Sequence, residues 1–255
     1  MAQYDDVAAD YARLIAPKYA PIARLVADRA VADAPAGPLT VVEVAAGTGL
    51  LTSMLVPRLP PGSSCTATDI SPSMLALARR LAPGAGVGHV CADAFRLPFA
   101  DGAADLVVSS LGPVQEDVRA FAEARRVLRP GGRVVLSAWG DAYAELDLLR
   151  AARARLALGD FPRDAVAAAV SRCREAGFEE VTATTTRLEV VHASLADYLD
   201  YRRSFGWPPW LPQERREEWL PAVAAETRAH LDGDGQVRLD WAIVLVRGRR
   251  PDPPT

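Results

Sequence analysis

The sequence predicts an α/β fold whose doubly wound, seven-stranded sheet is mostly parallel and has an antiparallel last strand. Two observations carry this prediction. Short runs rich in β-branched residues alternate with longer segments whose apolar residues recur at helical spacing, which is typical of βαβ units with right-handed crossovers. After about residue 140 this alternation gives way to helices and two long strand patterns. We therefore expect helical additions at the N-terminus and after the fifth and sixth strands.

The individual elements follow from the same patterns. Each strand pattern is bounded by turn-forming residues, and we expect strands at 39–45, 65–70, 87–92, 104–110, 132–139, 179–193 and 235–250. The last two are expected to pair as a hairpin. Helical spacing predicts helices within 50–59, 71–82, 115–128, 142–158, 162–178, 194–205 and 212–231. Ser71 before Pro72 is typical of an N-cap followed by proline at the first helical position.

The N-terminal segment precedes the first strand and therefore has no place in the parallel sheet. Its apolar and aromatic residues have the i, i+3, i+4, i+7 spacing of an amphipathic helix, at Tyr4, Val7, Ala8, Tyr11 and Leu14 or Ile15. The helix is expected to break at Pro17, because a residue before proline avoids helical geometry. A helix before such a hinge could act as a lid, and plain docking of its apolar face on the core is an equal alternative.

The composition argues against several classes of protein. The chain has 255 residues, 50% of them hydrophobic, and a formal net charge of −3, so a nucleic-acid partner is not expected. No run of about 18 apolar residues indicates a membrane span, and the acidic N-terminus lacks the apolar segment of a secretion signal. The three cysteines form no CxxC pair, which argues against a metal site. We expect a cytoplasmic monomer or homodimer.

The stretch from Val41 to Thr52, VVEVAAGTGLLT, predicts a buried strand, a glycine-rich turn and a helix. In a doubly wound sheet such a turn lies where ligands bind, and three interpretations compete. A P-loop needs a lysine after the turn, and the dinucleotide fingerprint needs a glycine at position 52; neither is present. The third is an acidic residue followed by spaced glycines around an amino-acid-bearing nucleoside, here Glu43-Val-Ala45-Ala-Gly47-Thr-Gly49.

With the residues that follow this turn, the chain resembles the class I S-adenosylmethionine (SAM) dependent methyltransferases. Asp69 follows Gly49 by 20 residues, and the stretches 92–110 and 123–139 are similar to the family's fourth- and fifth-strand regions. The resemblance covers roughly residues 1–140 and looks closest to the bacterial small-molecule and ubiquinone-type branch. It implies a Rossmann-like fold, SAM as cofactor with S-adenosylhomocysteine as product, and a small-molecule substrate. Ala45 stands where the family has its first glycine, and we expect a strand-like φ there.

The same resemblance divides the chain, taken as one domain over 1–255, into functional parts. Residues 1–35 would form a helical lid and residues 36–140 the SAM-binding core. Residues 141–250 would supply the remaining strands with helical insertions that cap the substrate, and residues 251–255 a tail.

The resemblance also implies roles for individual residues. Glu43 would hold the turn and meet the methionine moiety, and Asp69 would accept hydrogen bonds from both ribose hydroxyls. Asp93 would accept one from the adenine amine. The expected cofactor-binding set is Tyr11, Glu43, Ala45, Gly47, Gly49, Asp69, Ile70, Met74, Asp93, Ala94, Phe95, Ser109 and Ser110.

The acceptor and the catalytic groups are less defined by the sequence. The aromatic segment 198–212 is suited to an apolar pocket wall, and ordinary helix packing explains it equally well. The expected pocket residues are Tyr4, Gly112, Trp139, Tyr201, Phe205, Trp207 and Trp210. Methyl transfer needs alignment, and a base only if the nucleophile arrives protonated. No catalytic residue is identified; the candidates are His192, Gln115 and Tyr11.

Three functions remain open at this stage. The first is methyl transfer from SAM to a small, largely apolar metabolite, in natural-product biosynthesis. The second is a cyclase or another non-methylating enzyme that binds SAM on the same fold. The third is a non-enzymatic binding domain.

Overall fold

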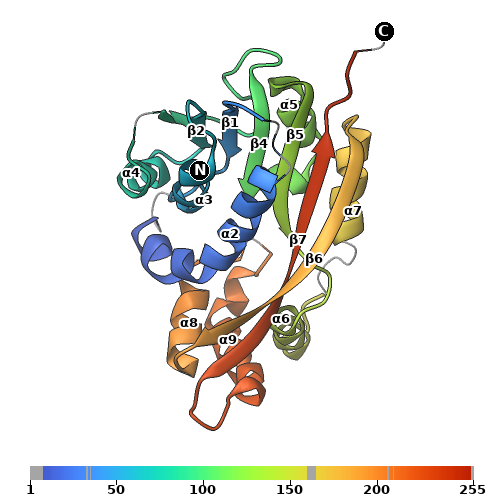
Figure 1. Cartoon of the computed structure of the whole chain (residues 1–255). Coiled ribbons are helices and arrows are strands. Elements are labelled where there is room, and N and C mark those ends of the chain that lie inside the picture. The colour runs from blue at the N-terminus through green and yellow to red at the C-terminus, as the bar shows by residue number, and fades with distance from the viewer. Residues whose placement is uncertain are drawn as a thin grey trace.

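The protein is described by a computed structural model that covers residues 8–253 except 33, 35, 85, 160–164, 206 and 209. Its seven strands form one sheet in the order β3-β2-β1-β4-β5-β7-β6 (Figure 1). The strands are β1 Thr40–Val44, β2 Ser64–Asp69, β3 Val87–Cys91, β4 Ala104–Ser110, β5 Leu128–Trp139, β6 Glu179–His192 and β7 Val237–Arg249. β1 to β5 are parallel, and β7 runs antiparallel to both β5 and β6. The predicted fold class is confirmed.

The strand order reverses at the centre of the sheet. From β1 the chain moves outward through β2 to β3, and it then returns to add β4 on the other side of β1. The crossover from β1 to β2 through α3 and the crossover from β4 to β5 through α5 therefore lie on opposite faces of the sheet, which opens a crevice at the carboxyl ends of β1 and β4. This topology, and no single motif, determines where a ligand can enter.

The helices occupy both faces of the sheet and one end of the molecule. They are α2 Ala16–Ala32, α3 Leu50–Leu55, α4 Pro72–Leu81, α5 Val118–Val127, α6 Ala144–Arg155, α7 Ala165–Glu175, α8 Leu195–Arg203 and α9 Arg216–Thr227. The predicted cap of α4 is present, because the Ser71 side chain accepts a hydrogen bond from the Met74 N–H. None of the helices among the described residues is long and apolar enough to cross a membrane.

The expected helix break at Pro17 is wrong. Residues 8–10 are already helical, a π-helical segment (η1) spans Tyr11–Ile15, and α2 continues from Ala16 through Pro17 and Pro21. Pro17 lies inside this helical run and not in its first turn, so its missing N–H removes one bond of the helical ladder. The π-helical turn before Pro17 accommodates the proline, because the Ala16 N–H bonds to the Tyr11 carbonyl, five residues back.

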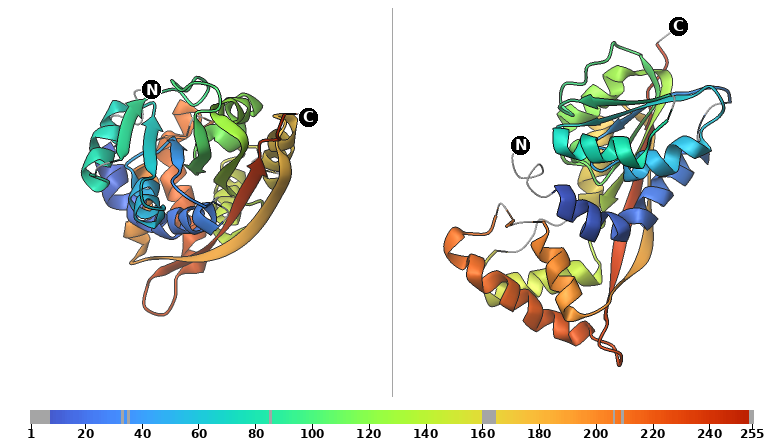
Figure 2. Two further views of the ribbon diagram at one scale, coloured as in Figure 1. Left: turned by 45° about the horizontal axis from the view of Figure 1, so that its top comes forward. Right: turned by 90° about the vertical axis from the view of Figure 1, so that its left-hand side faces the viewer.

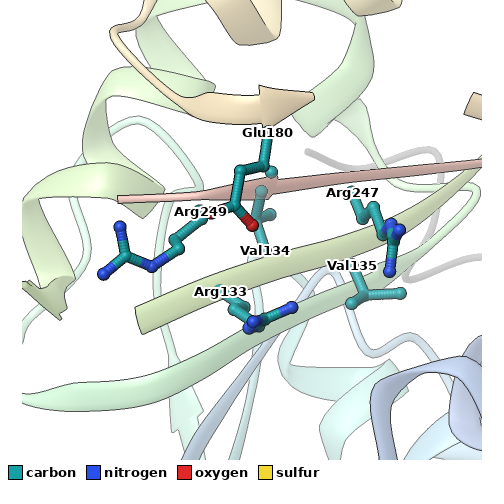
Figure 3. Close-up of a pocket in the computed structure, with 7 residues that line it drawn as sticks. Arg133, Val134, Val135, Glu180, Arg247 and Arg249 are labelled. Atoms are coloured by element: carbon teal, nitrogen blue, oxygen red, sulfur yellow. The ribbon is translucent and has the colours of Figure 1, made fainter. Parts of the chain in front are cut away.

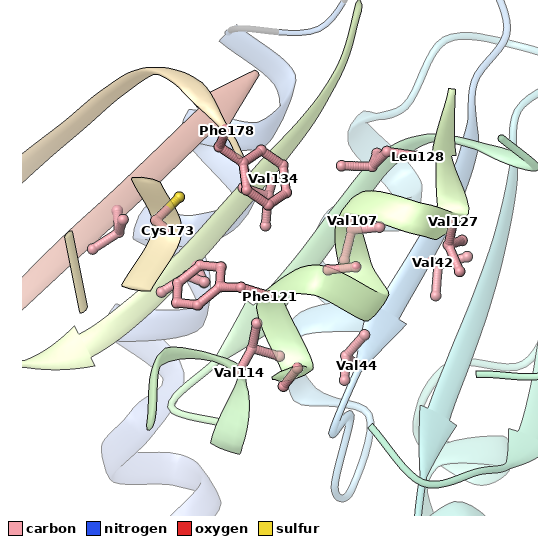
Figure 4. Close-up of a cluster of buried hydrophobic side chains, with 14 of the residues drawn as sticks. Val42, Val44, Val107, Val114, Phe121, Val127, Leu128, Val134, Cys173 and Phe178 are labelled. Atoms are coloured by element: carbon pink, nitrogen blue, oxygen red, sulfur yellow. The ribbon is translucent and has the colours of Figure 1, made fainter. Parts of the chain in front are cut away.

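The core lies on both faces of the central strands. Val42 and Val44 face a cluster that includes Phe121 and Phe178, under α5 and α7 (Figure 4). Val41, one residue along the same strand, faces the opposite cluster under α2 and α3. Because side chains alternate across a strand, a strand buried on both faces reads as the continuous apolar run seen in the sequence.

The long β6–β7 hairpin extends past the end of β5, and α6, α8 and α9 gather around its far end (Figures 1 and 2). We call these helices and the far ends of β6 and β7 the hairpin extension. Its core is aromatic: Tyr198, Tyr201 and Trp241 are almost fully buried there. The α2 helix and the hairpin extension flank the crevice at the carboxyl edge, so they are placed to shape whatever binds there.

Candidate functional site

A cavity of about 420 Å³ lies at the carboxyl ends of the central strands. It includes most of the residues that the sequence predicted for the cofactor and substrate. Those that line it are Tyr11, Ala45, Gly47, Asp69, Ile70, Met74, Asp93, Ala94, Phe95, Ser110, Gly112, Trp139 and Phe205. Tyr19, Ala92, Leu111 and Glu116 also line it and were not predicted.

The two glycines of the turn have different roles. Both have positive φ, +54° for Gly47 and +81° for Gly49. A Cβ on Gly49 would lie 2.8 Å from the Cα and Cβ of Ala78, so this glycine allows α3 to pack against α4. A Cβ on Gly47 would meet nothing within 4 Å, and Gly47 lines the cavity. Only Gly47 therefore presents bare backbone to a ligand.

The expectation of a strand-like φ at Ala45 is wrong. Ala45 has a φ of +56°, in the left-handed region that costs a non-glycine residue about 1–2 kcal/mol. The chain must turn sharply here because β1 ends at Val44 and Gly47 begins the turn toward α3. Opposite Ala45, a Cβ on Gly112 would lie 2.9 Å from the Ala45 Cβ. The alanine therefore takes a strained backbone conformation, and it fits because the residue opposite it, Gly112, has no side chain.

Asp69 ties the turn to the end of β2. Its Oδ2 accepts a hydrogen bond from the Gly47 N–H at 2.7 Å, and its Oδ1 accepts one from the Ser71 N–H at 2.9 Å. The side chain still lines the cavity, and each carboxylate oxygen has a second acceptor position. Asp69 is therefore suited to hold two ribose hydroxyls, and it has a structural role that the sequence did not indicate.

A second carboxylate, Asp93, lies in the loop after β3. Its Oδ1 accepts a hydrogen bond from the Phe95 N–H at 2.9 Å, which fixes the turn and leaves further acceptor capacity. Phe95 and Ile70 are large apolar side chains with 41% and 37% of their surface exposed, and both line the cavity. Two exposed apolar side chains next to a hydrogen-bond acceptor are suited to a flat heterocycle.

Glu43 lies beneath the turn and does not line the cavity. It is fully buried at the end of β1, and its Oε2 accepts a hydrogen bond from the Thr52 hydroxyl at 2.5 Å. Burial raises the pKa of Glu43 to about 8, although the Thr52 bond opposes this shift. Thr52 stands where a dinucleotide-binding fingerprint would have glycine, which argued against dinucleotide binding. In the structure the same residue anchors the buried Glu43 carboxyl group.

The end of β4 forms the floor of the cavity. Ser110 and Gly112 line it as predicted, whereas Ser109 is buried and a Cβ on Gly112 would nearly touch its Oγ. Between them, Leu111 lines the cavity with a φ of +53°, which is unusual for a leucine. The Leu111 N–H donates to Ser137 Oγ at 3.1 Å, so the neighbouring strand β5 holds this strained backbone in place.

One side of the cavity is aromatic. Tyr11, Tyr19, Trp139 and Phe205 line it, and we call these four residues the aromatic wall. Tyr19 packs edge to face on Tyr11 and Trp139, with ring centroids 6.4 and 6.0 Å apart. Burial raises the pKa of Tyr19 well above its usual value, so its phenol stays protonated near neutral pH. The wall supplies apolar contact area and no ready base.

Several predicted site residues are not brought to the cavity. His192 is fully buried between Tyr198 and Tyr201, and burial lowers its pKa to about 4. Tyr201 is part of the same buried cluster, in contact with Phe205. Trp207 lies near Arg216, and Trp210 packs on Trp219. Tyr201 and Trp210 pack against other aromatic rings, and none of these three aromatic residues lines the cavity.

Two further candidates stay predictions. Tyr4 lies outside the described residues, and the side chain of Gln115 is not described. Of the unpredicted lining residues, Tyr19 lies eight positions after Tyr11, about two helical turns along the chain, which was the available sequence signal. Leu111 and Glu116 gave no comparable signal, because only the fold of the loop after β4 brings them to the cavity.

A second cleft lies toward the other end of β5 (Figure 3). Arg133, Arg247 and Arg249 line it together with Glu180. Arg249 is paired with Asp252, and Arg247 donates to the Thr182 hydroxyl at 2.6 Å. The cleft has a volume of about 10 Å³, which is room for a single water molecule at most. It gathers positive charge far from the cavity and cannot hold an organic ligand.

Comparison with known proteins identifies the central part of the chain. A family profile described as a methyltransferase domain matches residues 42–136. The chain is 42% identical over 113 residues to a malonyl-[acyl-carrier protein] O-methyltransferase of Methylococcus capsulatus, covering 43% of this chain and 41% of that protein. It is 43% identical over 103 residues to a demethylmenaquinone methyltransferase of Thermus thermophilus, covering 39% of this chain and 46% of that protein. The chain thus matches less than half the length of either relative.

A solved structure supports the fold over a longer span. A chain from Anaeromyxobacter dehalogenans, provisionally named a type II methyltransferase, superposes with a TM-score of 0.64 at 22% identity. The alignment covers 90% of this chain and 97% of that one. At this identity the likeness establishes the fold and carries no statement about substrate.

Proposed function

Because a methyltransferase-domain profile matches residues 42–136, we propose that the whole protein is a class I SAM-dependent methyltransferase that transfers a methyl group from SAM to a small, largely apolar metabolite. The observation that carries this proposal is the arrangement around Gly47. A bare backbone turn, the Asp69 carboxylate and the Asp93 carboxylate line one cavity at the switch point of the sheet. Their order along the cavity wall suits an amino-acid-bearing nucleoside.

The residues present fit this cofactor. Gly47 leaves open space for the amino-acid portion, Asp69 would accept from the ribose hydroxyls, and Asp93 would accept from the adenine amine. Ile70 and Phe95 would enclose the adenine ring. When bound, the cofactor supplies a methyl group already activated on a sulfonium.

The chemistry that remains for the protein is alignment. Ser110, Leu111 and Gly112 would form the floor at the methyl end, and the aromatic wall would hold the acceptor and exclude water. Holding two reactants in line can lower a barrier by about 7–11 kcal/mol in favourable cases. Of the described lining residues, none is a histidine, lysine or cysteine. We therefore propose that the nucleophile arrives deprotonated or loses its proton to solvent.

Calorimetry tests the cofactor assignment. We expect S-adenosylhomocysteine and SAM to bind at the glycine turn and NAD and ATP not to bind. Tighter binding of NAD than of S-adenosylhomocysteine would overturn the assignment.

A second experiment separates the three functions. The protein is incubated with methyl-labelled SAM and a metabolite extract from its host. A labelled product supports methyl transfer. A changed but unlabelled product supports a SAM-binding cyclase or another non-methylating enzyme, which the lack of a histidine, lysine or cysteine among the described lining residues also fits. No change in any metabolite supports a non-enzymatic binding domain.

The finer expectations are part of the proposal. These are a role in natural-product biosynthesis, a cytoplasmic location, a monomer or homodimer as the working form, and no nucleic-acid partner. The lid formed by the N-terminal segment is also a proposal, and its test is given in the Discussion.

A further inference from the structure

The part of the cavity that the proposed function leaves for the acceptor has flat apolar surfaces. The aromatic wall supplies them, and its rings are fixed by their neighbours. Trp139 stacks on Tyr143 with centroids 5.5 Å apart, and Phe205 packs edge to face on the buried Tyr201 at 5.0 Å. Rings held in this way offer large contact areas at little entropic cost. They suit a planar acceptor.

The charge of the cavity is of one sign. Apart from the tyrosines, the ionisable side chains among its described lining residues are all carboxylates: Asp69, Asp93 and Glu116. Two of these are assigned to the cofactor, and Glu116 is exposed in the loop after β4. A cleft whose charged side chains are all carboxylates has a negative potential and attracts cations.

The nearby cations are held by carboxylates of their own. Arg202 lies behind Phe205, 5.3 Å from its ring centroid, and is paired with the buried Glu145 at 3.3 Å. Arg119 lies over Phe95 and is paired with Asp117 at 2.6 Å. Lys18 is paired with Asp197 at 3.2 Å. None of the three lines the cavity, and each has a carboxylate partner of its own.

We propose that the acceptor is an arylalkylamine, a planar aromatic ring that carries an aliphatic amine, attracted as its ammonium form by Glu116 and held against the aromatic wall. This inference rests on the proposed methyl transfer. The ammonium first gives one proton to bulk water. The nitrogen lone pair then bonds to the methyl carbon while the carbon–sulfur bond breaks and its electron pair stays on sulfur. The products are an N-methylammonium ion and S-adenosylhomocysteine, and no other reactant is needed.

Binding of three matched probes tests the proposal. Tryptamine, tryptophol and indole-3-propionate share the indole ring and two-carbon chain and end in a cation, a hydroxyl and an anion. Each is titrated into protein saturated with S-adenosylhomocysteine. We expect tryptamine to bind at least about tenfold more tightly than indole-3-propionate, with tryptophol between them, since a charged partner strengthens a hydrogen bond by about this factor. Equal or tighter binding of tryptophol or indole-3-propionate, or no binding of any probe, would overturn the proposal.

Two variants locate the charge that selects the amine. Glu116→Gln keeps the shape of the side chain and removes its charge, and we expect it to reduce the preference for tryptamine about tenfold. Glu217→Gln, on the exposed face of α9, is the matched control and is expected to leave the preference unchanged. An undiminished preference in Glu116→Gln would overturn the proposal. The titration with S-adenosylhomocysteine is done first: its failure counts against the proposed function, whereas binding without amine preference counts against this inference alone.

Discussion

The carboxyl edge of β1 and β2 lines the cavity and the hairpin extension lies beside it, and the two regions satisfy their buried polar groups in different ways. At the edge, Asp69 accepts hydrogen bonds from the backbone N–H groups of Gly47 and Ser71, 22 and 2 residues away in the chain. In the hairpin extension, Glu145 accepts one from the Trp241 indole at 2.5 Å, and the two residues are 96 positions apart. The edge uses nearby backbone, whereas the extension uses side chains that only the folded chain brings together.

The difference has a functional consequence. Backbone N–H groups lie where the strand and turn place them, so the cofactor end of the cavity depends on a few short segments. The aromatic wall depends on packing between α2, β5 and α8, whose residues are free to vary as long as volume is preserved. The two ends of the cavity that we propose for cofactor and acceptor therefore depend on different kinds of interaction. The predictions below test this division, from the largest expected effect to the smallest.

The largest effect is expected at Glu145. Besides Trp241, its carboxylate bonds to the Tyr198 hydroxyl at 3.2 Å and to Arg202 at 3.3 Å, and it is 3% exposed. Glu145→Ala leaves Arg202 buried without its partner, and we expect the free energy of unfolding to fall by about 3–5 kcal/mol. Urea denaturation measures this loss. Glu217→Ala on the exposed face of α9 is the control, and a loss below about 1 kcal/mol for Glu145→Ala would show that the extension does not depend on this cluster.

The buried carboxyl group at the edge predicts a pH dependence. The folded-state pKa of Glu43, about 8, lies above its unfolded value of 4.5. The unfolded chain therefore loses the proton first as pH rises, and the stabilising contribution is present below pH 4.5 and is lost progressively up to about pH 8. We expect a loss of the order of a few kcal/mol over this range, and a shallower dependence in Glu43→Gln. The free energy of unfolding of both proteins is measured by denaturation at pH 5 and pH 8.5. An equal change between these pH values in the two proteins would contradict the assignment.

Asp69 tests whether the edge combines a ligand role with a structural one. Asp69→Ala removes the proposed ribose contacts, and we expect S-adenosylhomocysteine to bind about 1.5–3 kcal/mol more weakly. Because Gly47 and Ser71 lose their acceptors, the free energy of unfolding should also fall, by about 1–2 kcal/mol. Asp69→Asn keeps one acceptor oxygen and should lose less of both. If affinity is unchanged in Asp69→Ala while stability falls, the residue is structural only.

A smaller effect is expected at Ala45. Ala45→Gly relieves the left-handed strain, and after the extra entropy of glycine in the unfolded chain we expect a gain of about 0.5–1 kcal/mol. The matched control is Ala46→Gly, whose φ is not positive and which should lose about 0.5–1 kcal/mol. Thermal denaturation of the two variants gives the comparison. A loss in Ala45→Gly equal to that in Ala46→Gly would contradict strain at this position.

The smallest effect concerns the proposed lid. Tyr11 lines the cavity, so we expect amide hydrogen exchange of residues 8–15 to slow when S-adenosylhomocysteine is bound. Exchange within α2 beyond Ile22, which is fully buried, serves as the internal reference and should not change. Equal protection of residues 8–15 with and without the ligand would contradict the lid and would mean that this segment only packs its apolar face on the core.

Local patterns in the sequence predicted much of the fold and of the cofactor end. The strand bounds, the Ser71 cap and the spacing of Gly47, Gly49 and Asp69 are short-range features, because hydrogen bonding and φ restrictions act between near neighbours. The same reasoning failed at Pro17 and Ala45. In each case the folded chain tolerated a locally unfavourable conformation that the sequence rule excluded.

The sequence by itself determined a mostly parallel sheet, a glycine turn at the cavity and the carboxylates around it, since each depends on residues within one or two adjacent elements. Only the tertiary structure decided which aromatic residues reach the cavity. Tyr19 and Phe205 line it, while Tyr201 and His192 are buried in the hairpin extension and Trp210 packs on Trp219. Aromatic side chains give the same pattern in a sequence whether they line a pocket or fill a core, because burial of apolar surface is favourable in both environments. Which of the two they occupy depends on how the β6–β7 hairpin and α2 pack against each other, and that packing is a property of the whole chain.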